Sequence, residues 1–126
     1  MTLAYWCVFA AIFFPYVWVV VAKAGPGYDN HAPRAHLAAA QGFRQRANWA
    51  HMNAFEAFPP FAAAVIIAQL AHANQGTVDV LALGFIAFRA AHGVCYVLDR
   101  ATLRSLMFGG GMACVIGLFG LAAGAS

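Results

Sequence analysis

The sequence predicts an all-α membrane protein, a bundle of four transmembrane helices that forms one domain over residues 1–126. Composition is the first reason, since 63% of the residues are hydrophobic and 9% are charged, whereas a soluble domain carries about 25% charged residues. The second reason is length, because a helix needs about 20 mainly apolar residues to cross a bilayer. Four apolar stretches meet this requirement, at 3–22, 47–72, 78–98 and 105–123.

The first stretch, 3–22, carries no charged residue. The tripeptide Ala22-Lys23-Ala24 at its end resembles the cleavage site of a signal peptide. However, no basic residue precedes the apolar run, and the run is longer than a typical signal core. We therefore expect a helix that is retained in the membrane.

The second stretch, 47–72, carries a polar stripe. Arg46, Asn53 and Glu56 follow one another at spacings of seven and three residues, which return to one face of a helix. A charge at the centre of a bilayer costs roughly 2.5–3.5 kcal/mol on insertion scales, so Glu56 is expected to face a partner or a polar site. Pro59 follows one turn later and should kink the helix.

The third stretch, 78–98, carries a matching stripe of Arg89, His92 and Tyr96. Two interpretations of the stripes stay open. In the structural one, Glu56 pairs with Arg89, and Asn53 forms hydrogen bonds between helices. In the functional one, the stripes line a pocket for a polar ligand.

The fourth stretch, 105–123, begins directly after Arg104. A cation at a helix N-terminus is unfavourable, so Arg104 and Ser105 predict an anion held there together with the helix amides. The simpler alternative is an interfacial Arg that marks topology. Small residues at spacings of three and four predict a flat packing face; they are Gly110, Ala113, Gly117, Gly120 and Gly124.

The basic residues are unevenly distributed among the loops. Lys23, Arg34, Arg44 and Arg46 lie in or beside the first loop, Arg100 and Arg104 in or beside the third, and none in the second. The positive-inside rule then places loops one and three in the cytoplasm and both termini outside. Residues 34–46 of the first loop suit a short helix. Since the basic residues are not clustered with exposed aromatic residues, nucleic acid is not an expected partner.

Neither the cysteine nor the histidine residues suggest a metal site. Cys7, Cys95 and Cys114 fall in three different helices without ligand spacing, so we expect them to pack as small apolar residues. The five His residues form no HxxxH or HExxH pattern. No metal is therefore expected.

Two segments resemble a known family, the membrane-associated proteins in eicosanoid and glutathione metabolism (MAPEG). Residues 46–56, RANWAHMNAFE, are similar to the signature of the family's second helix. Residues 89–96, RAAHGVCY, followed by Arg100 and Arg104-Ser105, are most similar to the branch of microsomal prostaglandin E synthase. Helix number and the basic first loop agree with this resemblance, and the chain looks like a bacterial-type member.

The resemblance implies a homotrimer in the bacterial inner membrane, in contact with lipid. Glutathione would lie in a cytoplasm-facing pocket between subunits, and a lipophilic small molecule would enter from the bilayer. The positions that match glutathione-binding residues are Arg46, Asn53, Glu56, Arg89, His92, Tyr96 and Ser105. Arg104 matches the residue that stabilises the glutathione thiolate, so the resemblance makes it the candidate catalytic residue.

The sequence departs from the family pattern at two positions. Trp49 stands where the family has a second Arg, and Phe108 stands where it has a Tyr. The leading hypothesis is a glutathione-dependent transferase or peroxidase that acts on a lipophilic electrophile. The alternative is a non-enzymatic membrane protein of the same fold, a structural subunit or a lipophile binder. A proton or ion path is a weaker idea, because we expect only one acidic side chain, that of Glu56, inside the membrane.

Overall fold

A computed structural model describes residues 1–125, and this part of the chain is entirely helical with short connections. The helices are α1 (Leu3–Ala11), α2 (Phe14–Lys23), α3 (Pro33–Ala38), α4 (Phe43–Leu70), α5 (Gln75–Val97) and α6 (Ala101–Ala125). Four segments are long and apolar enough to cross a membrane, with α1 and α2 together forming the first. The four predicted membrane helices are therefore confirmed.

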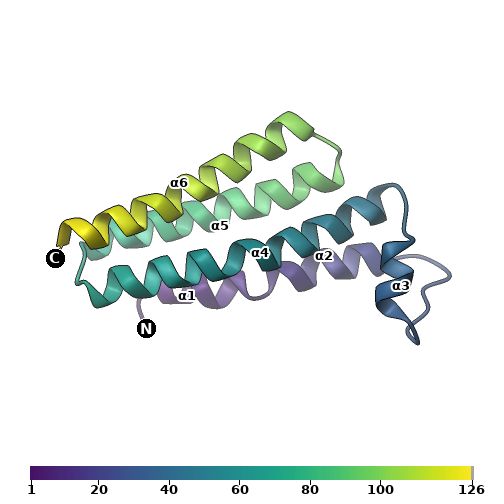
Figure 1. Ribbon diagram of the computed structural model, residues 1–126, viewed down its shortest axis with the longest axis horizontal. Helices are drawn as coiled ribbons and strands as arrows, with labels where there is room; N and C mark the ends of the chain where they lie inside the picture. Colours follow the sequence, from purple (N-terminus) through teal and green to yellow (C-terminus); the bar gives the residue numbers. More distant parts are fainter. Residues whose placement is uncertain (126) are drawn as a thin grey trace.

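The membrane helices run alternately up and down in one elongated bundle (Figure 1). The N-terminus, the α4–α5 turn and the end of α6 lie at one end of the bundle, whereas α3 and the α5–α6 turn lie at the other. Helix α4 is central, because it contacts α1, α2, α5 and α6. The N-terminus and the end of α6 thus lie at the same end of the bundle.

The first membrane segment is interrupted, although the sequence predicts one continuous helix over 3–22. Backbone N–H groups of Ile12 and Phe13 bond three residues back, to the carbonyls of Phe9 and Ala10, before α2 begins at Phe14. Pro15 explains the interruption, because it has no N–H to donate to the carbonyl of Ala11. The expected continuous helix over 3–22 is corrected to two helices in line.

The other three membrane helices begin earlier than predicted. They start at Phe43, Gln75 and Ala101 rather than at 47, 78 and 105, because helices continue through polar residues beyond the apolar core. Asn74 caps α5, since its side chain accepts a hydrogen bond from the Thr77 amide. The short helix expected over 34–46 is present as α3 but ends at Ala38.

Helix α4 stays continuous through Pro59 and Pro60. The two prolines leave the carbonyls of Phe55 and Glu56 without their usual helical donors. Phe61, next in the chain, is fully buried and stacks on Phe85 of α5, with ring centroids 3.9 Å apart. Both residues belong to the larger core cluster, which joins α1, α4, α5 and α6.

Only part of the predicted small-residue face of α6 contacts α5 within the chain. Gly110 and Gly117 do face α5, since an added Cβ would meet Phe88 or Leu81, respectively. An added Cβ at Gly120 or Gly124 would meet nothing within 4 Å in the described chain. The buried face of α6 instead contains Gly111, Cys114, Val115, Leu118 and Ala122. Cys7 and Cys114 are buried free thiols, as expected of packing residues, and Cys95 is half-buried.

Candidate functional site

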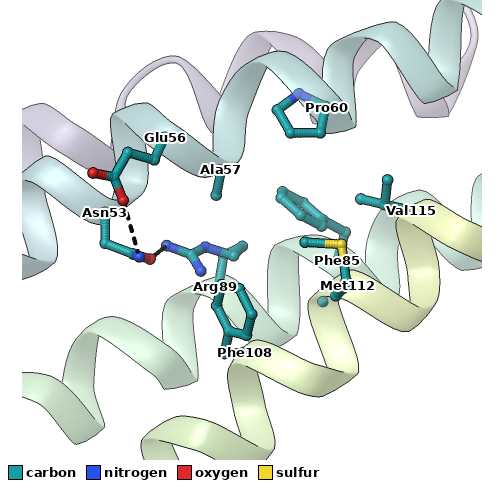
Figure 2. A pocket seen from close by; sticks show the side chains of 10 residues that line it. Asn53, Glu56, Ala57, Pro60, Phe85, Arg89, Phe108, Met112 and Val115 are labelled. Carbon is teal, nitrogen blue, oxygen red and sulfur yellow. Dashed lines mark hydrogen bonds between the residues drawn. The ribbon is translucent and has the colours of Figure 1, made fainter.

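A chain of polar contacts joins α4 to α5 near the middle of the bundle. Nη2 of Arg89 donates to Oδ1 of Asn53 at 2.7 Å, and Nδ2 of Asn53 lies 3.5 Å from Oε2 of Glu56 (Figure 2). Arg89 is only 5% exposed, whereas Glu56 is exposed at the surface of the chain. Asn53 therefore lies between a buried cation and an exposed carboxylate and contacts both.

Spacing along α4 and the packing of α5 against it bring Asn53, Glu56 and Arg89 together. Asn53 and Glu56 are three residues apart, so they share one face of α4. Arg89 lies on the buried face of α5, and its aliphatic stem packs beside Gly111 of α6, where an added Cβ would be in ordinary contact with Arg89 Cδ at 3.6 Å. Arg89 and Asn53 of the same chain are therefore in direct contact.

A cleft of about 190 Å³ lies beside this contact, between α4, α5 and α6. Asn53, Glu56 and Arg89 form its polar side. The other walls are largely apolar and include Pro60, Phe85, Phe108, Met112 and Val115 (Figure 2). The cleft thus places a buried guanidinium directly against a surface suited to a lipophilic molecule.

A second cleft of about 400 Å³ adjoins the first. Its lining shares Asn53 and Glu56 with the first cleft and adds Trp49, Met52 and Tyr96. The rings of Trp49 and Tyr96 lie 6.3 Å apart, centroid to centroid. Trp49 therefore supplies an aromatic wall at the position where the resemblance would place an Arg.

His92, Tyr96 and Arg104 form a second group, closer to the α5–α6 turn. The guanidinium carbon of Arg104 lies 4.5 Å from the centroid of Tyr96, a cation–π contact. His92 is 3% exposed and packs edge-on against Tyr96, with centroids 5.5 Å apart. Its Nδ1 is buried and finds no hydrogen-bond partner among residues 1–125.

Arg104 lies inside the first turn of its helix, whereas the apolar stretch predicted a helix that begins directly after it. Helix α6 begins at Ala101, and the Arg104 amide already donates to the carbonyl of Arg100 at 2.8 Å. The unpaired amides of the first turn therefore lie before Arg104. The prediction that free helix amides at Arg104 and Ser105 hold an anion is wrong. Ser105 itself is exposed.

Arg46 lies apart from the Asn53–Arg89 contact. Its Nε donates to the carbonyl of Val97 at 3.0 Å, which ties the start of α4 to the end of α5. This contact satisfies a carbonyl that the end of the helix leaves unpaired. Arg46 therefore has a clear structural role in the single chain.

Several polar contacts were not anticipated from the sequence. Asp79 accepts hydrogen bonds from the Ala4 amide at 2.9 Å and from Gln75 at 2.8 Å, so it caps α1 from α5. Asp79 lies within the predicted span 78–98, so Glu56 is not the only acidic side chain in the predicted spans. His51 Nδ1 donates to the Pro15 carbonyl at 2.7 Å. In the sequence, Asp79 and His51 are recognisable only as polar residues inside apolar stretches.

Comparison with known families decides the identity of the fold. The profile of the MAPEG family matches residues 3–124, almost the whole chain. The chain belongs to the MAPEG family. No individually curated protein matches the sequence. MAPEG membership is consistent with glutathione-dependent transfer, peroxidase chemistry or lipid metabolism.

Among residues 1–125 of this MAPEG protein, no cluster of three or more His, Cys, Asp or Glu could hold a metal ion.

Proposed function

We propose that the protein is a glutathione-dependent membrane transferase or peroxidase that acts on a lipophilic electrophile. The observation that carries the proposal is the position of the Arg89–Asn53 contact, which forms one side of a cleft with largely apolar walls. Such a boundary allows a charged co-substrate and a lipophilic substrate to meet. Membership of the MAPEG family supports the same chemistry.

The charges at the site complement those of glutathione, which carries two carboxylates and one ammonium group. The exposed carboxylate of Glu56 suits the ammonium group, and the guanidinium groups of Arg89 and Arg46 suit the carboxylates. Further hydrogen-bonding groups would come from Asn53, His92, Tyr96 and Ser105. These residues lie on α4, α5 and α6, so the proposed site would draw on three helices.

Arg104 is the proposed catalytic residue. An ordinary cysteine thiol has a pKa of about 8.5, so it is mostly protonated at neutral pH. A guanidinium near the sulfur would stabilise the thiolate and lower the pKa of the thiol. The thiolate would then donate an electron pair to an electrophilic carbon of the substrate, and the leaving group would depart with its bonding pair.

We further propose that the complete site forms in a homotrimer. Glu56 is exposed on the surface of one chain, within the second membrane segment. Hydrocarbon cannot solvate a carboxylate, so we expect a polar surface of another subunit to shield the Glu56 carboxylate from lipid. The positive-inside rule supports an orientation with the α3 end facing the cytoplasm, and we place the protein in a bacterial inner membrane from its resemblance to bacterial-type members of the family.

Calorimetric titration of the detergent-purified protein with reduced glutathione tests the proposal. We expect saturable binding at millimolar concentration or below, together with conjugation of glutathione to an aromatic chloride. S-methylglutathione is the matched control, since it should bind but not react. If reduced glutathione shows no saturable binding, the enzymatic proposal is wrong.

One observation favours a second candidate, a non-enzymatic protein that binds lipophilic molecules. Trp49 and Met52 give the second cleft an aromatic and apolar wall. A fluorescent apolar probe that binds with equal affinity in the presence and absence of glutathione, in a protein without turnover, would support this candidate.

A further inference from the structure

A basic pocket lies at the end of the bundle near α3, apart from the two clefts described above. It has a volume of about 310 Å³ and lies where α2 ends and α4 begins. Lys23, His36, Gln41 and Arg44 supply its polar lining, and none of the described residues that line it is acidic. It shares no lining residue with the clefts around Asn53.

Aromatic rings and backbone, rather than carboxylates, hold the two permanent cations of this pocket. Lys23 Nζ lies 5.2 Å from the ring centroid of Tyr28, and the Arg44 guanidinium carbon lies 5.4 Å from that of Phe43. The Arg44 guanidinium also lies against Gly25, where an added Cβ would overlap it. These contacts position both charges without neutralising them.

Arg44 also carries a donor that lacks an acceptor. Its Nε is buried and has no hydrogen-bond partner within the described residues 1–125. A buried donor left unsatisfied is costly, and an anion is the partner that satisfies a guanidinium best. Arg44 therefore indicates a ligand rather than a purely topological charge.

The N-terminus of α4 adds a further positive potential. This helix is 28 residues long, and its N-cap, Gly42, provides no capping side chain. The first helical bond runs from the Arg46 amide to the Gly42 carbonyl, so the amides of residues 43–45 have no helical acceptor. No acidic residue lies in the first turn to offset the helix dipole.

The position of the pocket indicates the source of an anion. Lys23 ends the first membrane segment and Phe43 begins the second, so the pocket lies at the level where both helices leave the membrane. Lipid phosphate groups occupy this level, and basic pockets between membrane helices bind such head groups. We propose that this pocket binds a phosphate anion, the group that an anionic phospholipid presents at the membrane surface.

Native mass spectrometry of the detergent-purified protein with added phosphatidylglycerol tests the proposal. A diacylglycerol with the same acyl chains is the ligand control, since it lacks the phosphate. Lys23→Gln should weaken phosphatidylglycerol binding about fivefold, the effect expected of one surface cation. Arg44→Gln should weaken it about tenfold, because it also removes the unsatisfied donor.

Arg100→Gln is the matched variant control. It removes the same charge from the α5–α6 turn, at the same end of the bundle but outside the pocket (Figure 1). It should leave lipid binding unchanged. Lys23→Gln keeps the packing of Arg44 on Gly25, so it tests the pocket even if Arg44→Gln fails to fold.

Calorimetry with inorganic phosphate, against chloride at equal ionic strength, distinguishes the two sources of phosphate. Binding of inorganic phosphate alone, with the same dependence on Lys23 and Arg44, would assign the pocket to a soluble phosphate anion. The proposal is overturned if neither ligand binds, if diacylglycerol binds as well as phosphatidylglycerol, or if Arg100→Gln weakens binding as much as the pocket variants do. None of these outcomes depends on glutathione.

Discussion

The contact between Arg89 and Asn53 determines the chemistry of the candidate site at the scale of single residues. A guanidinium that is 5% exposed has lost most of its solvation, so its 2.7 Å bond to Asn53 has to replace water. The longer 3.5 Å contact between Asn53 and Glu56 is weaker. Asn53 should therefore matter more to Arg89 than Glu56 does.

The first prediction concerns this order of importance. Asn53→Leu should lower the free energy of unfolding by roughly 1.5–3 kcal/mol, the contribution of a hydrogen bond to a charged group. The double variant Asn53→Leu/Arg89→Leu should recover part of this loss, since no charge is left buried. Thermal unfolding in detergent measures both. Additive effects of the two substitutions would show that the residues are not coupled.

The same reasoning supplies a control at Glu56. Glu56→Gln keeps an oxygen that can accept from Asn53 and removes only the charge. It should change the melting temperature less than Asn53→Leu does. An equal loss would mean that Glu56, rather than Asn53, compensates Arg89.

The second prediction concerns Arg104, whose guanidinium lies over the ring of Tyr96. If Arg104 stabilises the glutathione thiolate, Arg104→Ala should reduce the rate of conjugation about 100-fold, the effect of losing one preorganised electrostatic partner. Glutathione affinity should fall much less, because other residues supply most of the binding. Ultraviolet absorbance of the thiolate should show that bound glutathione ionises at lower pH in the wild type than in the variant.

Arg100→Ala is the control for this prediction. Arg100 lies four residues earlier and is exposed. Its removal should leave the conjugation rate close to that of the wild type. Equal losses in both variants would point to a general effect of charge at this end of the bundle.

The spacing of the polar residues predicted that each stripe would share one helix face. The position of Glu56 and Arg89 inside apolar stretches marked these two charges as unusual. Spacing could not predict that Asn53 contacts both within one chain, because that depends on how α4 and α5 pack. Nor could it show that Arg46 is bonded to the Val97 carbonyl. The apolar walls of the cleft, such as Phe85 and Met112, resemble ordinary core residues in a sequence.

At the scale of elements, the two tight turns between membrane helices share one geometry. His72 and Asp99 follow α4 and α5 with positive φ values of 55° and 58°. In each case the next amide bonds five residues back, from Ala73 to the Ala68 carbonyl and from Arg100 to the Cys95 carbonyl. This is the Schellman geometry, in which glycine is the usual residue.

The third prediction uses this geometry. Asp99→Gly should raise the melting temperature, because glycine avoids the cost of about 1 kcal/mol that a side chain meets in the left-handed conformation. His72→Gly should act in the same direction at the other turn. Asp99→Val should lower the melting temperature, since a β-branched residue is least tolerated there. A stabilising Asp99→Val would contradict this view of the turn.

Element boundaries depended on residues outside the apolar stretches. Hydropathy located all four membrane segments, but α6 begins four residues before the predicted start, which moved Arg104 away from the free amides. Pro15 marked the break between α1 and α2, yet Pro59 and Pro60 did not break α4. The sequence does not distinguish these cases, because the outcome depends on which neighbouring helices support the backbone.

At the scale of the whole molecule, the uneven distribution of basic residues gives the fourth prediction. Both termini lie at the end of the bundle opposite α3, and the basic residues of the first loop favour a cytoplasmic position for α3. A reporter enzyme fused to the C-terminus should be active if it requires the periplasm and inactive if it requires the cytoplasm. The reverse pattern would invert the topology.

The last prediction concerns assembly, and it depends on what covers Glu56. Native mass spectrometry should show a species of three times the 13.4 kDa mass of one chain. If another subunit covers the carboxylate, Glu56→Leu removes a polar contact and should weaken the trimer. If the carboxylate faced lipid, the same substitution would remove a cost of roughly 2.5–3.5 kcal/mol and stabilise the protein. Cover by another subunit therefore predicts that Glu56→Leu lowers the stability, whereas exposure to lipid predicts that it raises the stability. A Glu56→Leu variant that melts at a higher temperature and remains monomeric would rule out the proposed trimer.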